Sequence, residues 1–131
     1  MADVMTPNPH SVGSDQPLSA ARALLAKHDI RHLPVREGGA LVGLISERDI
    51  LFALAVEEQH GLALKVQELV MPDPYFVSPN TPLRTTLDHM MHAKIGSCLV
   101  VEGDQLVGIY TTVDVCRDFS TLLAEKERDA R

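Results

Sequence analysis

The sequence is poor in several features that mark whole classes of protein. Aromatic residues make up only 4% of its 131 residues, and tryptophan is absent. No uncharged apolar stretch approaches the roughly 20 residues that a membrane-spanning helix needs. Residues 1–5 carry neither the positive charge nor the apolar run of a secretory signal. We therefore expect a cytoplasmic protein with no membrane partner.

Cysteine is scarce as well, and basic residues do not cluster. Cys98 and Cys116 fit neither a zinc spacing nor a disulfide framework, and Cys98 lies in an apolar run that predicts a buried position. Asp and Glu number 18 against 12 Lys and Arg, which gives a formal net charge of -6 at pH 7. Because surfaces that bind nucleic acids need concentrated positive charge, we expect no nucleic-acid partner.

Catalytic motifs are missing too. The chain has no P-loop and no dinucleotide-binding glycine fingerprint. No nucleophile is paired with both a base and an oxyanion donor. His89 and His92 lie three residues apart, but no nearby ligand set completes a metal site, so we interpret them as part of a polar helix face. The sequence predicts a protein that is not an enzyme and holds no metal.

What the chain does contain is an internal duplication. When the sequence is shifted by 65 positions, Pro7 falls on Pro72, and the register holds without a gap through Leu51 and Cys116. The identical pairs include Pro17/Pro82, Ile30/Ile95, Val35/Val100, Gly38/Gly103, Gly43/Gly108 and Asp49/Asp114. Prolines, glycines and an aspartate in one ungapped register indicate two copies of one unit.

Each copy has the pattern of the same α/β (α+β) unit, in the order β-α-β-β-α. In the first copy a helix opens at Pro17, strands follow at 33–35 and 41–45, and a second helix comes next. In the second copy the last helix carries Phe119 and Leu122, which we expect to face the core. Because one small sheet leaves a bare face, we expect the two tandem units to pack through their sheets with pseudo-two-fold symmetry.

The predicted domain boundaries follow the copies. The first repeat spans 1–60, a linker 61–66, the second repeat 67–124 and a charged C-terminal tail 125–131. The tail is expected to be a solvated helix end or a frayed terminus.

The most informative position is the strand-to-helix junction, which occurs twice. Ser46 and Asp49 in the first copy, and Thr111 and Asp114 in the second, place a hydroxyl and a carboxylate three residues apart at a helix N-terminus. One interpretation is a helix cap that resembles a capping box. The other is a ligand site, since free amides attract a phosphate and a first-turn carboxylate accepts hydrogen bonds from a ribose diol. Both interpretations stay open.

The strands before the junctions extend the ligand interpretation. Gly43 and Gly108 would let a ligand approach the backbone closely. Strand alternation puts Leu44 on the same face as the first junction hydroxyl, and Ile109 on the same face as the second. There they would form an apolar wall for a flat base.

These motifs resemble the CBS domain, the module named after cystathionine β-synthase. The resemblance rests on the opening segment 3–7, on 30–35 and 41–50, and in the second copy on 70–72, 106–109 and 111–114. It covers nearly the whole chain. Two tandem copies imply a CBS pair (Bateman module), which in that family commonly binds adenosine nucleotides in clefts between the copies.

The resemblance assigns roles to residues at both junctions. It implies ribose binding by Asp49 and Asp114, a hydroxyl at the helix N-terminus from Ser46 and Thr111, base contact by Leu44 and Ile109, and phosphate binding by Arg31, His32 or Arg48. The second copy departs from the pattern, since Gly96, Ser97 and Val113 replace the three cationic candidates. We therefore expect two unequal sites.

The sequence thus predicts a small regulatory protein that binds AMP, ADP or ATP as a regulatory ligand and relays this to an unidentified regulated protein. The resemblance also implies a homodimer. Two alternatives remain. One is a ligand-free dimeric interaction module whose junctions are ordinary caps, and the other is the same fold binding S-adenosylmethionine or NAD.

Overall fold

A computed structural model describes residues 1–71 and 73–130. Predictions that involve Pro72 and Arg131 lie outside the described residues. The elements in chain order are β1 (Thr6–Pro7), β2 (Val12–Gly13), α1 (Leu18–His28), β3 (His32–Glu37), β4 (Ala40–Ser46), α2 (Glu47–His60), the short 3-10 helix η1 (Val66–Glu68), β5 (Phe76–Val77), α3 (Leu83–Ala93), β6 (Ser97–Glu102), β7 (Gln105–Thr111) and α4 (Thr112–Asp129). In the described residues no helix is long and apolar enough to cross a lipid bilayer.

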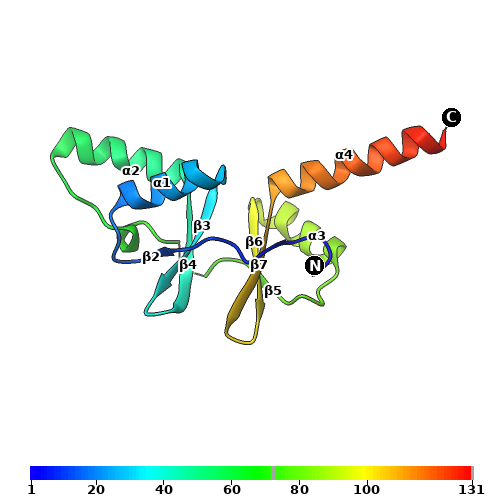
Figure 1. The fold of residues 1–131 in the computed structure, drawn as a ribbon, viewed down its shortest axis with the longest axis horizontal. Coiled ribbons are helices and arrows are strands. Elements are labelled where there is room, and N and C mark those ends of the chain that lie inside the picture. Colours follow the sequence, from blue (N-terminus) through cyan, green and yellow to red (C-terminus); the bar gives the residue numbers. More distant parts are fainter. Residues whose placement is uncertain (72, 131) are drawn as a thin grey trace. The chain divides into compact units, whose positions relative to one another are not determined.

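The chain folds into two compact units, each a small sheet with helices (Figure 1). The first unit, residues 9–74, has the sheet order β2-β3-β4 and the helices α1 and α2. The second unit, residues 1–8 with the chain from Tyr75 onward, has the sheet order β1-β7-β6-β5 and the helices α3 and α4. The mixed α+β class and the β-α-β-β-α order of each copy are confirmed.

The duplication is visible in the backbone as well. The β3–β4 hairpin has a register shift after Val35, and the β6–β7 hairpin has the same shift after Val100. Helices α1 and α3 both end at a residue in the left-handed conformation, Asp29 with φ 51° and Lys94 with φ 56°. Positions 65 residues apart therefore share backbone geometry as well as sequence.

The opening segments of the two copies are exchanged between the sheets. β1 opens the first copy but pairs antiparallel with β7 of the second copy, with Thr6 opposite Ile109. At the equivalent place in the second copy, Met71 pairs with Leu44 of β4 through two backbone hydrogen bonds of 2.9 and 3.3 Å. Each sheet is thus extended by backbone from the other copy. The two compact units are defined by these contacts in the structure. The boundaries predicted above for the repeats and the linker describe the sequence copies, and they stay a prediction.

Gly43 and Gly108 make room for the exchanged segments. A Cβ on Gly43 would clash with the carbonyl oxygen of Met71 and would lie 2.7 Å from Val70 Cγ2. A Cβ on Gly108 would lie 2.8 Å from Met5 Cγ. The chain's own opening segments therefore occupy the space beside these glycines, and the approach of a ligand to the backbone there stays a prediction.

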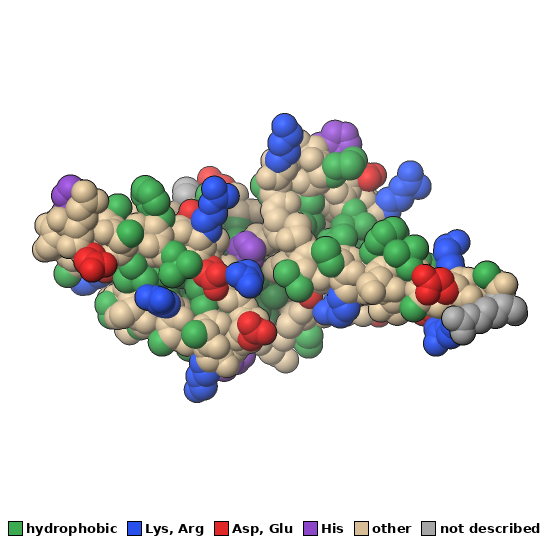
Figure 2. All heavy atoms as spheres, turned by 90° about the horizontal axis from the view of Figure 1, so that it is seen from above, with side chains coloured by type: hydrophobic (Ala, Val, Ile, Leu, Met, Phe, Trp, Pro, Cys, Tyr) green, Lys and Arg blue, Asp and Glu red, His purple; other side chains and the backbone are tan. Residues whose placement is uncertain are grey.

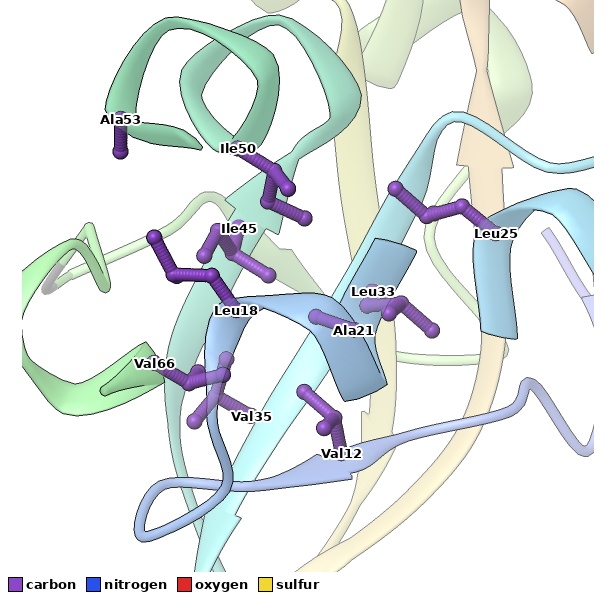
Figure 3. Packing of buried hydrophobic residues seen from close by; sticks show 10 residues of the cluster. All are labelled: Val12, Leu18, Ala21, Leu25, Leu33, Val35, Ile45, Ile50, Ala53 and Val66. Carbon is purple, nitrogen blue, oxygen red and sulfur yellow. The ribbon is translucent and has the colours of Figure 1, made fainter. Parts of the chain in front are cut away.

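The core of the first unit draws on both helices, the β2, β3 and β4 strands and η1 (Figure 3). Its buried residues are Val12, Leu18, Ala21, Leu25, Leu33, Val35, Ile45, Ile50, Ala53 and Val66. The core of the second unit contains Met1, Val77, Met90, Cys98, Val100 and Tyr110, so the predicted burial of Cys98 is confirmed. Full burial of a side chain such as Ile50 contributes about 1.5–3 kcal/mol, so these clusters hold each sheet to its helices.

Helix α4 departs from the predicted packing. Val115 packs against the core of the second unit, but Phe119 and Leu122 are 58% and 45% exposed. In the first unit α2 packs along α1, whereas α4 contacts mainly β7 and runs on past the end of that strand (Figure 1). The prediction that Phe119 and Leu122 face the core is wrong for this reason. The exposed end of α4 agrees with the solvated tail expected there, as far as residue 130.

Substitution of the two glycines tests the exchanged packing. We expect Gly43→Ala to lower the free energy of unfolding by about 1–3 kcal/mol, because its methyl group meets backbone that is held by the pairing of Leu44 with Met71. Gly108→Ala should cost less, because the obstructing atoms belong to the flexible Met5 side chain. Urea denaturation measures both values, and equal costs would contradict the close backbone crossing at Gly43.

Candidate functional site

The first junction joins β4 to α2 through Ser46. Ser46 is the N-cap of α2, and its Oγ accepts a hydrogen bond of 3.2 Å from the backbone N–H of Asp49. The Asp49 residue is exposed, and its carboxylate has no hydrogen-bond or ion-pair partner within residues 1–71 and 73–130. The cap therefore uses the serine hydroxyl and leaves the carboxylate available at the positive end of the helix dipole.

Two arginines lie near this junction, and within the described residues only one of them is paired with a carboxylate. Arg31 Nη1 donates to the Glu47 carboxylate at 2.7 Å, and the Arg31 carbonyl oxygen accepts a 2.8 Å hydrogen bond from the Glu47 backbone N–H. Arg48 lies exposed in the first turn of α2. Arg48 therefore faces solvent, whereas Arg31 must leave Glu47 before it can bind another anion.

His32 is the third cationic candidate. It lies opposite Ser46 in the β3–β4 ladder and is half-buried. Burial lowers the pKa of His32 below 6.5, and the negative charge of Asp49 acts in the opposite direction. The imidazole is therefore mainly neutral at pH 7 and becomes easier to protonate when more negative charge arrives nearby.

The two strand residues predicted to contact a base are buried. Leu44 is 9% exposed and Ile109 is 8% exposed. Each belongs to a backbone pair with an exchanged segment, Leu44 with Met71 and Ile109 with Thr6. Strand alternation puts Leu44 on the opposite face from the core residue Ile45. Their role in base contact stays a prediction.

The second junction uses its aspartate differently. Asp114 is 8% exposed, and its Oδ2 accepts hydrogen bonds from the Thr111 backbone N–H at 2.8 Å and the Thr111 hydroxyl at 3.3 Å. Its Oδ1 accepts a 3.0 Å hydrogen bond from Arg117 Nη1. Both carboxylate oxygens are engaged within the chain, so the two junctions differ in the availability of their aspartates.

Sequence reasoning missed the polar cluster that surrounds Arg117. Arg117 Nε donates to Asp118 Oδ1 at 3.2 Å, and the Tyr110 hydroxyl donates to Asp118 Oδ2 at 2.7 Å. Burial and the hydrogen bond to Asp118 raise the pKa of Tyr110. One signal was present in the sequence, because Arg117 follows Asp114 by three residues, a spacing at which helix side chains meet.

The other histidines and cysteines of the described residues form no candidate metal site. In the described part of the chain, no group of three or more His, Cys, Asp or Glu side chains is arranged to hold a metal ion. His89 stacks on Tyr75 with ring centroids 3.9 Å apart, and His92 Nδ1 lies 2.7 Å from the Asp88 carbonyl oxygen. Burial raises the pKa of Cys98 to about 12, so its thiol is protonated at neutral pH. These groups are accounted for by packing within the second unit.

Comparison with known proteins identifies the family of this chain. The sequence model described as the CBS domain matches residues 1–56 and 66–120. The chain belongs to the CBS domain family. Its two matched segments make it a CBS domain pair, which is a regulatory module.

Three solved structures of similar sequence share the fold. AcuB from Vibrio cholerae is 32% identical with a TM-score of 0.82, over 97% of this chain and 94% of that one. The CBS domain pair of protein MJ0100, solved with 5′-methylthioadenosine and S-adenosyl-L-methionine, is 28% identical with a TM-score of 0.81, over 92% and 94%. CBSX2, solved with AMP, is 27% identical with a TM-score of 0.75, over 92% and 96%.

The chain spans only a small part of some curated relatives. An inosine-5'-monophosphate dehydrogenase from Korarchaeum cryptofilum is 32% identical over 130 residues, which are 98% of this chain but 25% of that protein. For an A-adding tRNA nucleotidyltransferase from Geobacter sulfurreducens, the match covers 11% of the relative. CBS sequences similar to this one therefore occur inside longer enzymes.

The unequal use of the two aspartates predicts unequal stability effects without ligand. Asp114→Ala should lower the free energy of unfolding by about 1.5–3 kcal/mol, because it removes hydrogen bonds to a buried charged group. Asp49→Ala should change it by only about 0.5 kcal/mol, because the side chain is exposed and the Ser46 cap remains. Urea denaturation of both variants measures the difference. A larger loss for Asp49→Ala would contradict the hydrogen bonding described above.

Proposed function

We propose that this CBS pair is a regulatory sensor that binds an adenosine-containing ligand at the Ser46–Asp49 junction. The observation that carries the proposal is the Asp49 carboxylate, which is exposed at the N-terminus of α2 and has no partner in the described residues. A first-turn carboxylate accepts both hydrogen bonds of a ribose diol, as acidic residues do in dinucleotide sites. The Thr111–Asp114 junction is the second candidate.

The groups around Asp49 suit the rest of a nucleotide. The positive end of the α2 dipole attracts a phosphate, and Arg48 adds an exposed positive charge in the same turn. His32 gains a proton more readily when a phosphate lies nearby, so it stabilises the bound anion. Leu44 is the proposed contact for the adenine ring, and Arg31 joins the phosphate site if it leaves its ion pair.

Two structural neighbours support the ligand class. Protein MJ0100 was solved with 5′-methylthioadenosine and S-adenosyl-L-methionine, and CBSX2 was solved with AMP. These ligands share the adenosine group and differ in what the ribose carries. Because the first junction gathers Arg31, His32 and Arg48, we favour AMP, ADP or ATP over S-adenosylmethionine, whose sulfonium is positively charged.

A sensor also needs a protein that responds to it. We infer a regulated partner that distinguishes the liganded chain from the free chain, through the different affinities of the ligand for the two states. The alternative is a ligand-free interaction module in which Ser46 only caps α2. An exposed carboxylate that takes no part in the cap favours the sensor.

Thermal denaturation of nucleotide-stripped protein tests the ligand. AMP, ADP, ATP, S-adenosylmethionine and NAD are compared on the same preparation. A ligand at about 100 times its dissociation constant adds about 2.7 kcal/mol, which for a chain of this size raises the melting temperature by about 10 °C. We expect this shift with an adenosine nucleotide, and we expect Asp49→Ala to remove it.

Glu58→Ala is the matched control for this experiment. Glu58 is an exposed acidic residue near the C-terminal end of the same helix, about three turns from the Ser46 cap. Its replacement should leave the ligand-induced rise in melting temperature unchanged. A folded protein that shifts with none of the five ligands would contradict the nucleotide proposal and leave the interaction module as the better account.

We also infer a homodimer that forms through α4. Val113, Phe119, Leu122 and Leu123 are 63%, 58%, 45% and 45% exposed, and Figure 2 shows hydrophobic side chains (green) along this helix. Their spacing puts several of them on one helix face. Contiguous exposed apolar surface commonly marks an interface, and the resemblance to CBS pairs implied a second copy as the partner.

Gel filtration with light scattering tests the dimer. Phe119→Asp combined with Leu122→Asp should give a monomer with an unchanged circular dichroism spectrum, because both side chains are exposed in the single chain. Met91→Asp on α3 is the control, since Met91 is an exposed apolar residue of another helix and its change should leave the dimer intact. A monomeric wild-type protein would contradict the inference.

A further inference from the structure

Arg117 is held from three sides beside the second junction. Its Nη1 donates to Asp114 Oδ1 at 3.0 Å, its Nε donates to Asp118 Oδ1 at 3.2 Å, and its Nη2 donates to the Val4 carbonyl oxygen at 3.4 Å. Asp118 is itself fixed by the Tyr110 hydroxyl at 2.7 Å. The guanidinium is therefore kept in place by two carboxylates and one backbone carbonyl rather than by one exposed ion pair.

The first junction has no counterpart of this cluster. The residues 65 positions before Arg117, Asp118 and Tyr110 are Phe52, Ala53 and Ile45. Phe52 is 74% exposed, whereas Ala53 and Ile45 belong to the apolar core of the first unit. Asp49 therefore has no cation one turn further along its helix, and its carboxylate stays available.

We propose that Arg117 closes the second junction to nucleosides, so that each chain binds one adenosine-containing ligand, at Asp49. A ribose diol needs carboxylate oxygens as acceptors. In Asp114 one oxygen already accepts from Arg117, and the other accepts two hydrogen bonds from Thr111. To bind there, a ribose would have to displace the hydrogen bond between Arg117 and the mostly buried Asp114 carboxylate. This bond is charge-assisted and therefore stronger than a hydrogen bond between neutral groups. This inference rests on the proposed function.

Arg117 also has a structural role, because it links α4 to the opening segment of the first copy. The bond from its Nη2 to the Val4 carbonyl oxygen ties the opening segment of the first copy to α4. The same segment pairs through Thr6 with Ile109 of β7. Asp114 thus acts in the second unit as an anchor for Arg117, whereas Asp49 in the first unit keeps its carboxylate for a ligand.

Isothermal titration calorimetry with AMP, and separately with S-adenosylmethionine, tests this inference. The wild-type chain should bind one ligand, and Asp49→Ala should bind none. Arg117→Met keeps the apolar stem of the side chain but frees Asp114, so it should bind two. The double variant Asp49→Ala with Arg117→Met should bind one. Arg117→Gln removes the positive charge but keeps a polar side chain, and it should change the stoichiometry in the same direction if Arg117→Met folds poorly.

The possible failures are distinguishable. Two sites of equal affinity in the wild type, or one site that is unaffected by both Arg117→Met and Arg117→Gln, would overturn the closure by Arg117 and leave the proposed function intact. Loss of binding in a folded Arg117→Met protein would show that Arg117 is a ligand group and would also overturn it. No binding of either compound to the wild type or the variants would overturn both proposals.

Discussion

The pairing of each copy's opening segment with the other copy's sheet is the constraint on which the structure depends. Met71 pairs with Leu44 on β4, and Thr6 pairs with Ile109 on β7. Strand β4, which leads into α2, and strand β7, which leads into α4, are therefore hydrogen-bonded along both edges. Because the backbone must come so close, Gly43 cannot carry a side chain without displacing the Met71 carbonyl. The exchange therefore places each junction at the end of a strand that is paired on both sides.

On this common frame, the duplication has produced two junctions with different chemistry. The first caps its helix with the Ser46 hydroxyl and leaves the Asp49 carboxylate exposed. The second buries Asp114 and uses both of its oxygens inside the chain. Two aspartates at equivalent positions therefore have different hydrogen-bond partners. One turn later along the helix the first copy has Phe52, whereas the second copy has Arg117, which donates a hydrogen bond to Asp114.

Much of the fold could be predicted because it depends on local signals. The ungapped repeat, the tight turns at the hairpins and the hydroxyl–aspartate spacing indicated the order of elements, the CBS resemblance and the position of both junctions. The exchange of opening segments could not be predicted, because a two-residue strand such as β1 carries no periodicity and its partner lies about a hundred residues away in the chain. The exposure of Phe119 and Leu122 was missed because helical spacing identifies an apolar face but not what covers it.

The full difference between the two junctions could be recognised only from the side-chain geometry. The substitutions at Arg31, His32 and Arg48 predicted unequal junctions, but they pointed to the phosphate side of the site. The hydrogen bonds show that the inequality extends to the aspartates, since Asp114 is engaged by Arg117. The predicted roles in ribose, phosphate and base binding remain proposals that depend on a bound ligand.

The most direct test of the account is an NMR titration of the wild-type chain with AMP, in which the backbone amide resonances are followed residue by residue. We predict that the largest shifts fall on the first junction, from Leu44 to Asp49, while the amides from Thr111 to Asp114 change little. Equal shifts at both junctions would contradict the closed second junction. Shifts confined to other parts of the chain, or none at saturating AMP, would contradict the assignment of the nucleotide site to Asp49.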